Sequence, residues 1–213
     1  MALTHWMARP AALWVAMLIG FGLCAPQAQA AYLVTVEQVG SDVVATGSGS
    51  INFDALAFYI DESDSALLVA SGGAVVVGPT ILTDDTYYSG ITGPDVSFGS
   101  GAQFFASSGG GGLVGLGTFL QTSGGVVAVP RDYISGAPLG TSTATWAGAT
   151  ISSLGLTPGT YVWGWGSGAT ADTFTLDIRE GLAVPEPATW AMMLLGLAGL
   201  ALVRSRRRLP TSE

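Results

Sequence analysis

Between residues 31 and 180, hydrophobic and polar positions form short β-like runs, and no stretch carries a convincing helical period. The clearest run is Thr173–Arg179, in which Phe174, Leu176 and Ile178 would face one side and polar residues the other. Such alternation is expected of a strand with one buried face. Because short runs of this kind are separated by Gly, Pro and Asp clusters, the pattern predicts an all-β fold, a single β-sandwich or jelly-roll-like domain.

The same pattern predicts further strands and the turns between them. Gly40–Asp42 would turn the chain between the first two strands. Pro158-Gly159 is typical of a type II turn and precedes the predicted strand Tyr161–Trp165. That strand would form a closing hairpin with Thr173–Arg179. The predicted strands are Tyr32–Val39, Val43–Thr46, Ala55–Ile60, Ala74–Val77, Gln103–Ala106, Leu113–Leu120, Val126–Val129, Ser142–Trp146 and Tyr161–Trp165.

Three polar or glycine-rich runs are predicted to interrupt the strands. The acidic run Asp61–Asp64 would end the third strand, and Asp84-Asp85 would mark a turn. The run Gly109–Gly112 would form a flexible surface loop, because glycine has the greatest backbone freedom.

The N-terminal segment has the three parts of a secretory signal peptide. Arg9 supplies the positive charge, Ala11–Leu23 the apolar centre and Ala28-Gln29-Ala30 the small-residue cleavage site. Cleavage there would leave Ala31 as the first residue of the mature protein. Lipidation at Cys24 is an alternative, but a bulky residue precedes this cysteine where lipoprotein signals carry a small one.

The C-terminal segment combines a rigid triplet, an apolar run and a basic cluster. Pro185-Glu186-Pro187 cannot continue a helix, so it predicts a stiff, exposed, extended peptide. As a transmembrane helix, the uncharged run Ala188–Val203 would be about 24 Å long, slightly short of a hydrocarbon core of about 30 Å. Trp190 lies near its entrance, where an indole suits the membrane interface. Four arginines follow, which would stop transfer and place the C-terminus in the cytoplasm: Arg204, Arg206, Arg207 and Arg208.

The order and spacing of these parts resemble the PEP-CTERM sorting signal of Gram-negative bacteria, with Val184-Pro185-Glu186-Pro187 as its motif. The resemblance implies that an exosortase, a membrane transpeptidase-like enzyme, recognises Pro185, Glu186 and Pro187 and removes the tail during export. It also implies a transient membrane anchor, then a place at the cell surface or in the extracellular matrix of bacteria that produce exopolysaccharide and form biofilms. The stretch Thr157–Gly166, continued by Asp172–Leu176, also resembles a recurring ending of such cargo proteins. An ordinary C-terminal membrane anchor is the alternative.

These features divide the chain into three parts. Residues 1–30 form the predicted signal peptide, residues 31–183 a Gly-, Ser- and Thr-rich β-sandwich domain, and residues 184–213 the sorting signal. The middle part is long enough for one hydrophobic core.

Composition narrows the functions open to the mature domain. Between Ala31 and Val184 there is no Cys, His or Lys, and two arginines stand against thirteen Asp and Glu, for a formal charge of −11. A nucleic-acid partner is not expected, because phosphate binding needs cations. The missing residue types also remove a Ser-His-Asp triad, a thiol nucleophile, a Schiff-base lysine and a typical zinc site. No cofactor is expected.

Carboxylates are the remaining candidates for catalysis. Two of them could act as acid and base on a glycoside. Most lie in turn-like contexts, where Asp satisfies local backbone donors, so we predict a non-enzymatic protein with a glycan-active enzyme as the less favoured alternative. The acids in question are Asp54, Asp61, Glu62, Asp84, Asp85, Asp132 and Asp172.

Calcium is the best metal hypothesis, because it takes hard oxygen ligands and extracellular sites can be weak. The acidic clusters follow neither the EF-hand spacing nor the repeated Gly-Asp pattern of calcium β-rolls, so no metal site is assigned. The weak candidates are Asp61, Glu62, Asp64, Asp84 and Asp85.

Three aromatic residues, Tyr161, Trp163 and Trp165, would share one face of the strand that contains them. An exposed aromatic face could bind sugar rings, which would make the domain a carbohydrate-binding module and the exopolysaccharide a partner. A buried face would instead anchor the core, since each such ring removes about 150–250 Å² from water. Period-two aromatic faces are usually of the second kind.

Overall fold

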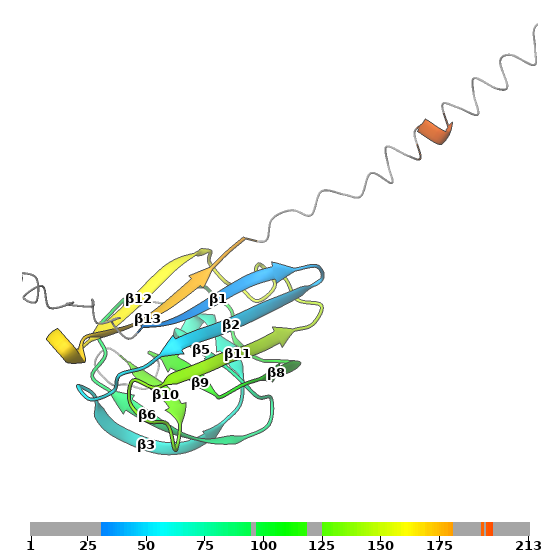
Figure 1. Cartoon of the computed structure of the whole chain (residues 1–213). Coiled ribbons are helices and arrows are strands. Elements are labelled where there is room, and N and C mark those ends of the chain that lie inside the picture. The colour runs from blue at the N-terminus through cyan, green and yellow to red at the C-terminus, as the bar shows by residue number, and fades with distance from the viewer. Residues whose placement is uncertain (1–30, 95–96, 119–124, 181–192, 194, 198–213) are drawn as a thin grey trace, which may run out of the picture.

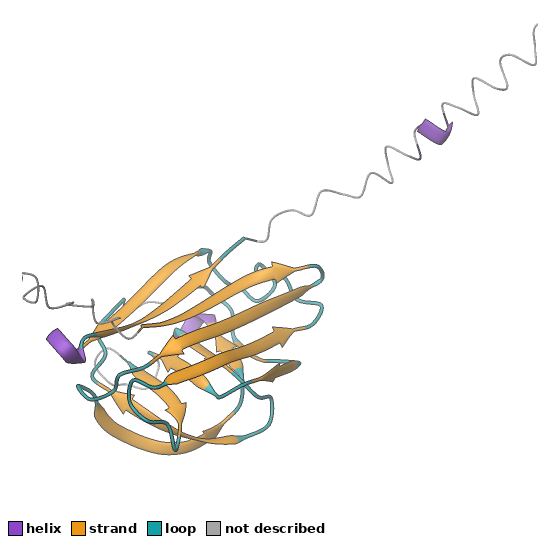
Figure 2. Ribbon diagram, in the orientation of Figure 1, coloured by secondary structure: helices purple, strands orange, loops and turns teal. Residues whose placement is uncertain are grey.

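The computed structural model describes residues 31–94, 97–118, 125–180, 193 and 195–197. Within them the chain forms two β-sheets and two short 3-10 helices, so the all-β prediction is confirmed. Figure 1 shows the two sheets as two layers, and Figure 2 shows how far strands dominate the described chain. The predicted signal peptide, the triplet Pro185-Glu186-Pro187 and the four C-terminal arginines lie outside the described residues.

The first sheet has six strands and contains both the first and the last strand of the fold. The order is β12-β13-β1-β2-β11-β8, and β1 pairs with β13 in parallel while the other neighbours are antiparallel. The bounds are β1 Ala31–Val39, β2 Asp42–Ser50, β8 Ser108–Gly110, β11 Pro138–Trp146, β12 Gly159–Trp165 and β13 Asp172–Ile178.

The second sheet has seven antiparallel strands in the order β3-β6-β10-β9-β5-β4-β7. Along the named strands the chain passes from one sheet to the other four times, after β2, β7, β8 and β10. The bounds are β3 Ala57–Asp64, β4 Leu67–Val69, β5 Ala74–Val77, β6 Thr83–Ser89, β7 Gln103–Phe105, β9 Val114–Gly117 and β10 Val126–Pro130. The 3-10 helices are η1, Ala70–Gly72, and η2, Gly168–Thr170.

The main hydrophobic core lies between the two sheets. It combines side chains of β1, β2, β12 and β13 with side chains of β5, β9 and β10, and β5 contacts both β2 and β11 across the layers. The largest fully buried side chains include Trp163, Tyr32, Phe98 and Phe174. One core therefore joins the two layers, as expected of a β-sandwich.

Strand β13 shows the predicted alternation residue by residue. Phe174, Leu176 and Ile178 are buried and the residues between them are half-buried. The strand pairs with β12 on one side, as the closing-hairpin prediction requires, and with β1 on the other. Since β1 and β13 are parallel, the chain enters the sheet at one end and leaves it at the opposite end, as Figure 1 shows.

The segment that follows β6 bridges to the outer edge of β12 at Gly164. The backbone N–H of Thr92 donates to the carbonyl of Gly164 at 2.8 Å, and the N–H of Gly164 donates back at 2.7 Å. A Cβ on Gly93 would lie 2.3 Å from Cδ1 of Trp163. Glycine at this position therefore lets the backbone lie directly against the buried indole.

Most strand predictions are confirmed, but the two acidic runs were placed wrongly. Asp61–Asp64 continues β3, and Asp84-Asp85 lies inside β6. The two runs pair with each other, Glu62 opposite Asp85 and Ser63 opposite Asp84. An edge strand that is exposed on both faces accepts polar residues throughout, so β3 carries no alternation to reveal it.

The prediction of a flexible loop at Gly109–Gly112 was also wrong for its first half. Gly109 and Gly110 belong to β8, which pairs with β11. A Cβ on Gly109 would lie 2.1 Å from the carbonyl oxygen of Gly78 and 2.5 Å from that of Thr143. The glycine is required because three backbone segments meet there, which is a common reason for glycine in strands.

The predicted transmembrane helix is largely outside the described residues. Its described positions, Met193 and 195–197, are helical and exposed. The described part of the chain includes no helix with the length and apolar character needed to cross a bilayer.

Truncating β13 in the core should destabilise the domain strongly. Phe174→Ala removes a fully buried ring that packs on Tyr32 and Trp163, so we expect a loss of about 3–5 kcal/mol in the free energy of unfolding. Val162→Ala, on the exposed face of neighbouring β12, should change it by about 0.5 kcal/mol or less. Urea unfolding of the purified protein measures both, and equal losses would contradict the described burial.

Candidate functional site

The candidate site is a strip of side chains at the edge of the seven-stranded sheet, on the face that turns toward the core. Cross-strand pairing places Phe58 opposite Tyr88, Asp61 opposite Thr86 and Ser63 opposite Asp84. Tyr88 packs against the core, which identifies the face, yet every residue of β3 except the half-buried Asp64 is exposed. We call the strip formed by Phe58, Asp61, Ser63, Asp84, Thr86 and Tyr88 the β3–β6 ledge.

One end of the ledge is aromatic. The Tyr88 ring stacks on Phe53 with centroids 4.3 Å apart and planes 10° from parallel, and Phe53 meets Tyr133 edge-on at 6.0 Å. Phe58 follows in the register with 63% of its surface exposed. A bulge between Phe58 and Ile60 gives β3 an extra residue beside the exposed ring.

Two loops hold the aromatic end rigidly. Tyr133 Oη accepts a hydrogen bond from the backbone N–H of Ile51 at 2.9 Å and donates to the carbonyl of Ala137 at 2.5 Å. The N–H of Phe53 donates to Ser135 Oγ at 3.1 Å. Loops 51–56 and 131–137 are thereby fastened to each other, which fixes the Phe53 ring under Tyr88.

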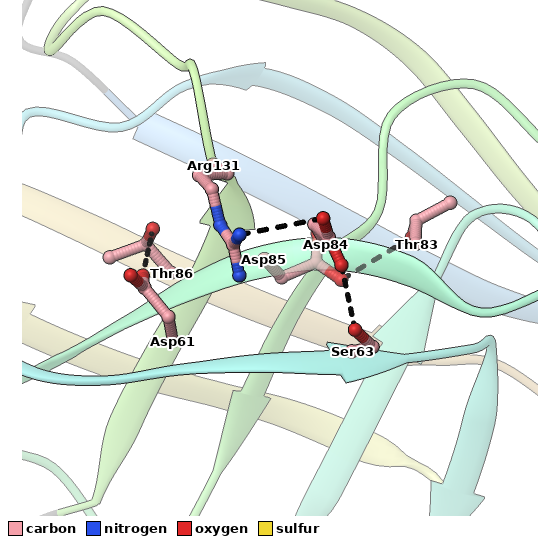
Figure 3. A network of polar contacts seen from close by, with 7 residues as sticks. All are labelled: Asp61, Ser63, Thr83, Asp84, Asp85, Thr86 and Arg131. Atoms are coloured by element: carbon pink, nitrogen blue, oxygen red, sulfur yellow. Dashed lines mark hydrogen bonds and ion pairs between the residues drawn. The ribbon is translucent and has the colours of Figure 1, made fainter.

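The other end of the ledge is polar and already hydrogen-bonded. Thr86 Oγ1 donates to Asp61 Oδ1 at 2.7 Å, and Ser63 Oγ donates to Asp84 Oδ1 at 2.7 Å. Arg131, just after β10, reaches Asp84 Oδ2 at 3.4 Å, and Figure 3 shows this network along the two strands. The ion pair is largely exposed, so it contributes about 1 kcal/mol at most to stability.

The aromatic and polar ends are close enough to influence each other. Burial raises the pKa of Tyr88, and the carboxylate of Asp61 adds to the rise. The ledge is therefore one continuous surface that passes from an exposed ring to hydrogen-bonding groups.

The opposite face of the same two strands contains a buried carboxyl group. Asp85 is fully buried, Thr83 Oγ1 donates to its Oδ2 at 3.3 Å, and its Oδ1 has no hydrogen-bond partner among the described residues. Burial raises the pKa of Asp85 to about 7. The hydrogen bond from Thr83 lowers this pKa, the charges of Asp64 and Asp84 raise it, and the charge of Arg131 lowers it. Sequence reasoning treated this residue as a solvated turn acid, which was wrong.

The weak calcium candidates come together across β3 and β6 without forming a ligand set. Glu62 and Asp85 are neighbours in the register, and Asp64 Oδ2 accepts a hydrogen bond from Tyr87 Oη at 2.9 Å. Among the described residues, no three Asp, Glu, His or Cys side chains converge in a way that could hold a metal ion.

The aromatic face predicted on β12 belongs to the core. Trp163 is fully buried and Trp165 is 5% exposed, while Tyr161 is half-buried and packs near Phe98. Trp165 Nε1 donates to the carbonyl of Asn52 at 2.6 Å, which ties β12 to the loop after β2. The hypothesis of an exposed sugar platform at this face was wrong, and the core interpretation is confirmed.

The other acids considered for catalysis are dispersed. Asp54 and Asp132 lie in turns, as predicted. Asp172 is buried and accepts backbone hydrogen bonds from Asn52 at 2.5 Å and Thr173 at 2.6 Å, so it fastens β13 to the loop after β2. Burial raises its pKa, and the two N–H donors lower it.

An open cleft of about 570 Å³ lies where β13 ends. Its polar lining includes Gln38, Ser100, Thr150 and Thr157, and Glu180 is the acid among the described residues that line it. Among the described lining residues there is thus no second carboxylate to pair with Glu180.

Sequence reasoning missed the aromatic part of the ledge. The signal that could have found it is the run Phe58-Tyr59-Ile60, three bulky apolar residues directly before four polar ones. Exposure of such a run becomes visible only when β3 is known to be an edge strand, and the stacking of Phe53 on Tyr88 depends on a loop far from β6 in sequence.

Comparison with known families identifies the C-terminal segment. The family described as the PEP-CTERM protein-sorting motif matches residues 183–208. The chain therefore carries a PEP-CTERM sorting domain, as the residues Pro185, Glu186 and Pro187 implied. The motif indicates an exported protein that is targeted and processed by an exosortase, with a destination at the cell surface or outside it. No curated protein and no solved structure matches the chain.

The buried carboxyl group should make stability depend on pH. Folded Asp85 keeps its proton up to about pH 7, whereas the unfolded chain releases it near pH 3.8, so its contribution is full below pH 3.8 and is lost as pH rises through 7. Asp85→Asn should therefore be more stable than the natural protein at pH 8, by about 1–3 kcal/mol, with the gain vanishing near pH 4.

Urea unfolding at a series of pH values measures this difference. Asp132→Asn, in an exposed turn, is the matched control and should show no such trend. A gain from Asp85→Asn that is equal at pH 4 and pH 8 would contradict the burial of a titrating carboxyl group.

Proposed function

We propose that this chain is a non-enzymatic surface or extracellular-matrix protein of a Gram-negative bacterium, associated with exopolysaccharide and biofilm. A signal peptide, residues 1–30, delivers a single β-sandwich domain across the inner membrane, and the C-terminal helix holds it there transiently. The exosortase then removes the tail and releases or transfers the domain. The jelly-roll-like description and the domain boundaries stay predictions.

The single observation that carries the proposal is the PEP-CTERM match at residues 183–208, directly after the last described strand of the β domain. In this proposal Pro185, Glu186 and Pro187 are the recognition residues. The arginines Arg204, Arg206, Arg207 and Arg208 stop transfer on the cytoplasmic side.

The chemistry of the domain supports a role in binding or structure. The mature part has no Cys, His or Lys, and its acids are dispersed among strands, turns and the core. A carboxylate-based glycan-active enzyme stays the less favoured alternative.

Changing the sorting triplet should block processing and leave folding intact. With Pro185→Ala and Pro187→Ala together, we expect the protein to keep its C-terminal tail and to remain with the membranes of its host. An epitope placed after Glu213 and followed by immunoblotting of membranes and medium measures the retained tail. Normal loss of the epitope from this variant would contradict recognition of the triplet.

A control separates sorting from folding. Thr160→Ala, on the exposed part of β12, leaves the triplet unchanged and should be processed at the normal rate. If the natural protein itself keeps the epitope and stays in the membranes, the chain is an ordinary anchored protein and the sorting proposal is wrong.

A further inference from the structure

We propose that the β3–β6 ledge binds a neutral saccharide chain. The inference rests on the proposed function, because only an exported domain meets extracellular glycans. It deepens that function by naming the surface and the chemical class of the ligand.

The exposed ring is the first step of the argument. Phe58, with 63% of its surface exposed, lies in an acidic edge strand where a charged or hydroxyl side chain would suit water better. Its neighbours Tyr59 and Ile60 are 42% and 37% exposed, and Ile60 pairs with Tyr87, so exposed apolar side chains lie on both faces of this edge strand. Exposed apolar side chains gathered in one place mark an interaction surface.

The arrangement of rings determines what such a surface can hold. Phe58 lies opposite Tyr88 in the register, and the half-buried Tyr88 ring stacks on Phe53 within 10° of parallel. The face of an aromatic ring carries partial negative charge and attracts the C–H groups of a sugar ring. Rings that are held rigidly lose little conformational entropy when a ligand lies on them.

Hydrogen-bonding groups follow directly beyond the rings. Asp61, Ser63 and Asp84 are exposed, and Arg131 adds N–H donors beside Asp84. Sugar hydroxyls both donate and accept, so they match a surface that combines carboxylates, a hydroxyl and a guanidinium. The carboxylates already accept hydrogen bonds from Thr86 and Ser63, which holds them in fixed positions.

Charge disfavours an anionic ligand. Asp85 is buried and keeps its proton up to about pH 7, so four carboxylates on β3 and β6 remain beside the one cation that contacts them among the described residues, Arg131 after β10: Asp61, Glu62, Asp64 and Asp84. An anionic polysaccharide would be repelled by this field.

Affinity gel electrophoresis of the processed mature protein tests the proposal. The gels contain either the neutral polysaccharide fraction recovered from the matrix of the producing bacterium or the anionic polymer alginate. We expect the neutral fraction, and not alginate, to retard the protein. Phe58→Ala and Phe58→Leu should each weaken binding about fivefold to tenfold, since both remove the ring.

Matched variants keep the result interpretable. Phe58→Leu preserves an apolar side chain, so an equal loss in both Phe58 variants assigns the effect to the aromatic ring. Leu33→Ala removes an exposed apolar residue on the six-stranded sheet and should bind normally. Because Phe58 is exposed, its variants should unfold at the same temperature as the natural protein.

Three results would overturn the inference: no retardation by the neutral fraction, retardation that Phe58→Ala leaves unchanged, or salt-sensitive binding to a basic polymer such as polylysine in its place. A protein that is processed and exported but does not bind the neutral fraction would contradict the ledge proposal alone. A protein that keeps its C-terminal tail would contradict the proposed function, whatever it binds.

Discussion

The fold depends on burial of one alternating strand, β13, between β12 and β1. Phe174, Leu176 and Ile178 fill the core between the two sheets, and the parallel pairing with β1 joins the last strand of the domain to the first. Without β13 the six-stranded sheet loses the link between β12 and the rest, so the domain can be complete only after residue 178 has been exported. The same strand ends at Ile178, at the end of the sheet opposite to Ala31.

Polar groups divide the domain surface into regions of different character. The outer face of the six-stranded sheet carries several threonines and few charged residues. Near β13, Arg179 forms an ion pair with Asp177 at 2.7 Å. Acids gather instead on β3 and β6, at the end of the ledge away from the exposed Phe58, and Asp85 is buried with its proton held to about pH 7. In the ledge proposal this uneven distribution would disfavour anionic ligands, because the acidic edge repels anions.

The sequence predicts those features of the fold that leave an alternating pattern or a motif. Thr173–Arg179 alternates because the core covers only one face of β13. Trp163 and Trp165 are buried because aromatic residues spaced two apart lie on the inner face of their strand. Alternation fails at β3, where both faces meet water, and at Gly109, where glycine serves close backbone approach. Asp85 and the ledge stayed hidden for a different reason, since their character depends on which strands become neighbours, and that is decided by contacts far apart in the chain.

Intact-mass spectrometry of the protein recovered from its native host, from membranes and from medium, tests the central claim most directly. The account predicts a chain that begins at Ala31 and ends near Pro185 to Pro187, with or without an added group, at the cell surface or in the medium. A chain that still ends at Glu213 and is confined to the membranes would contradict it.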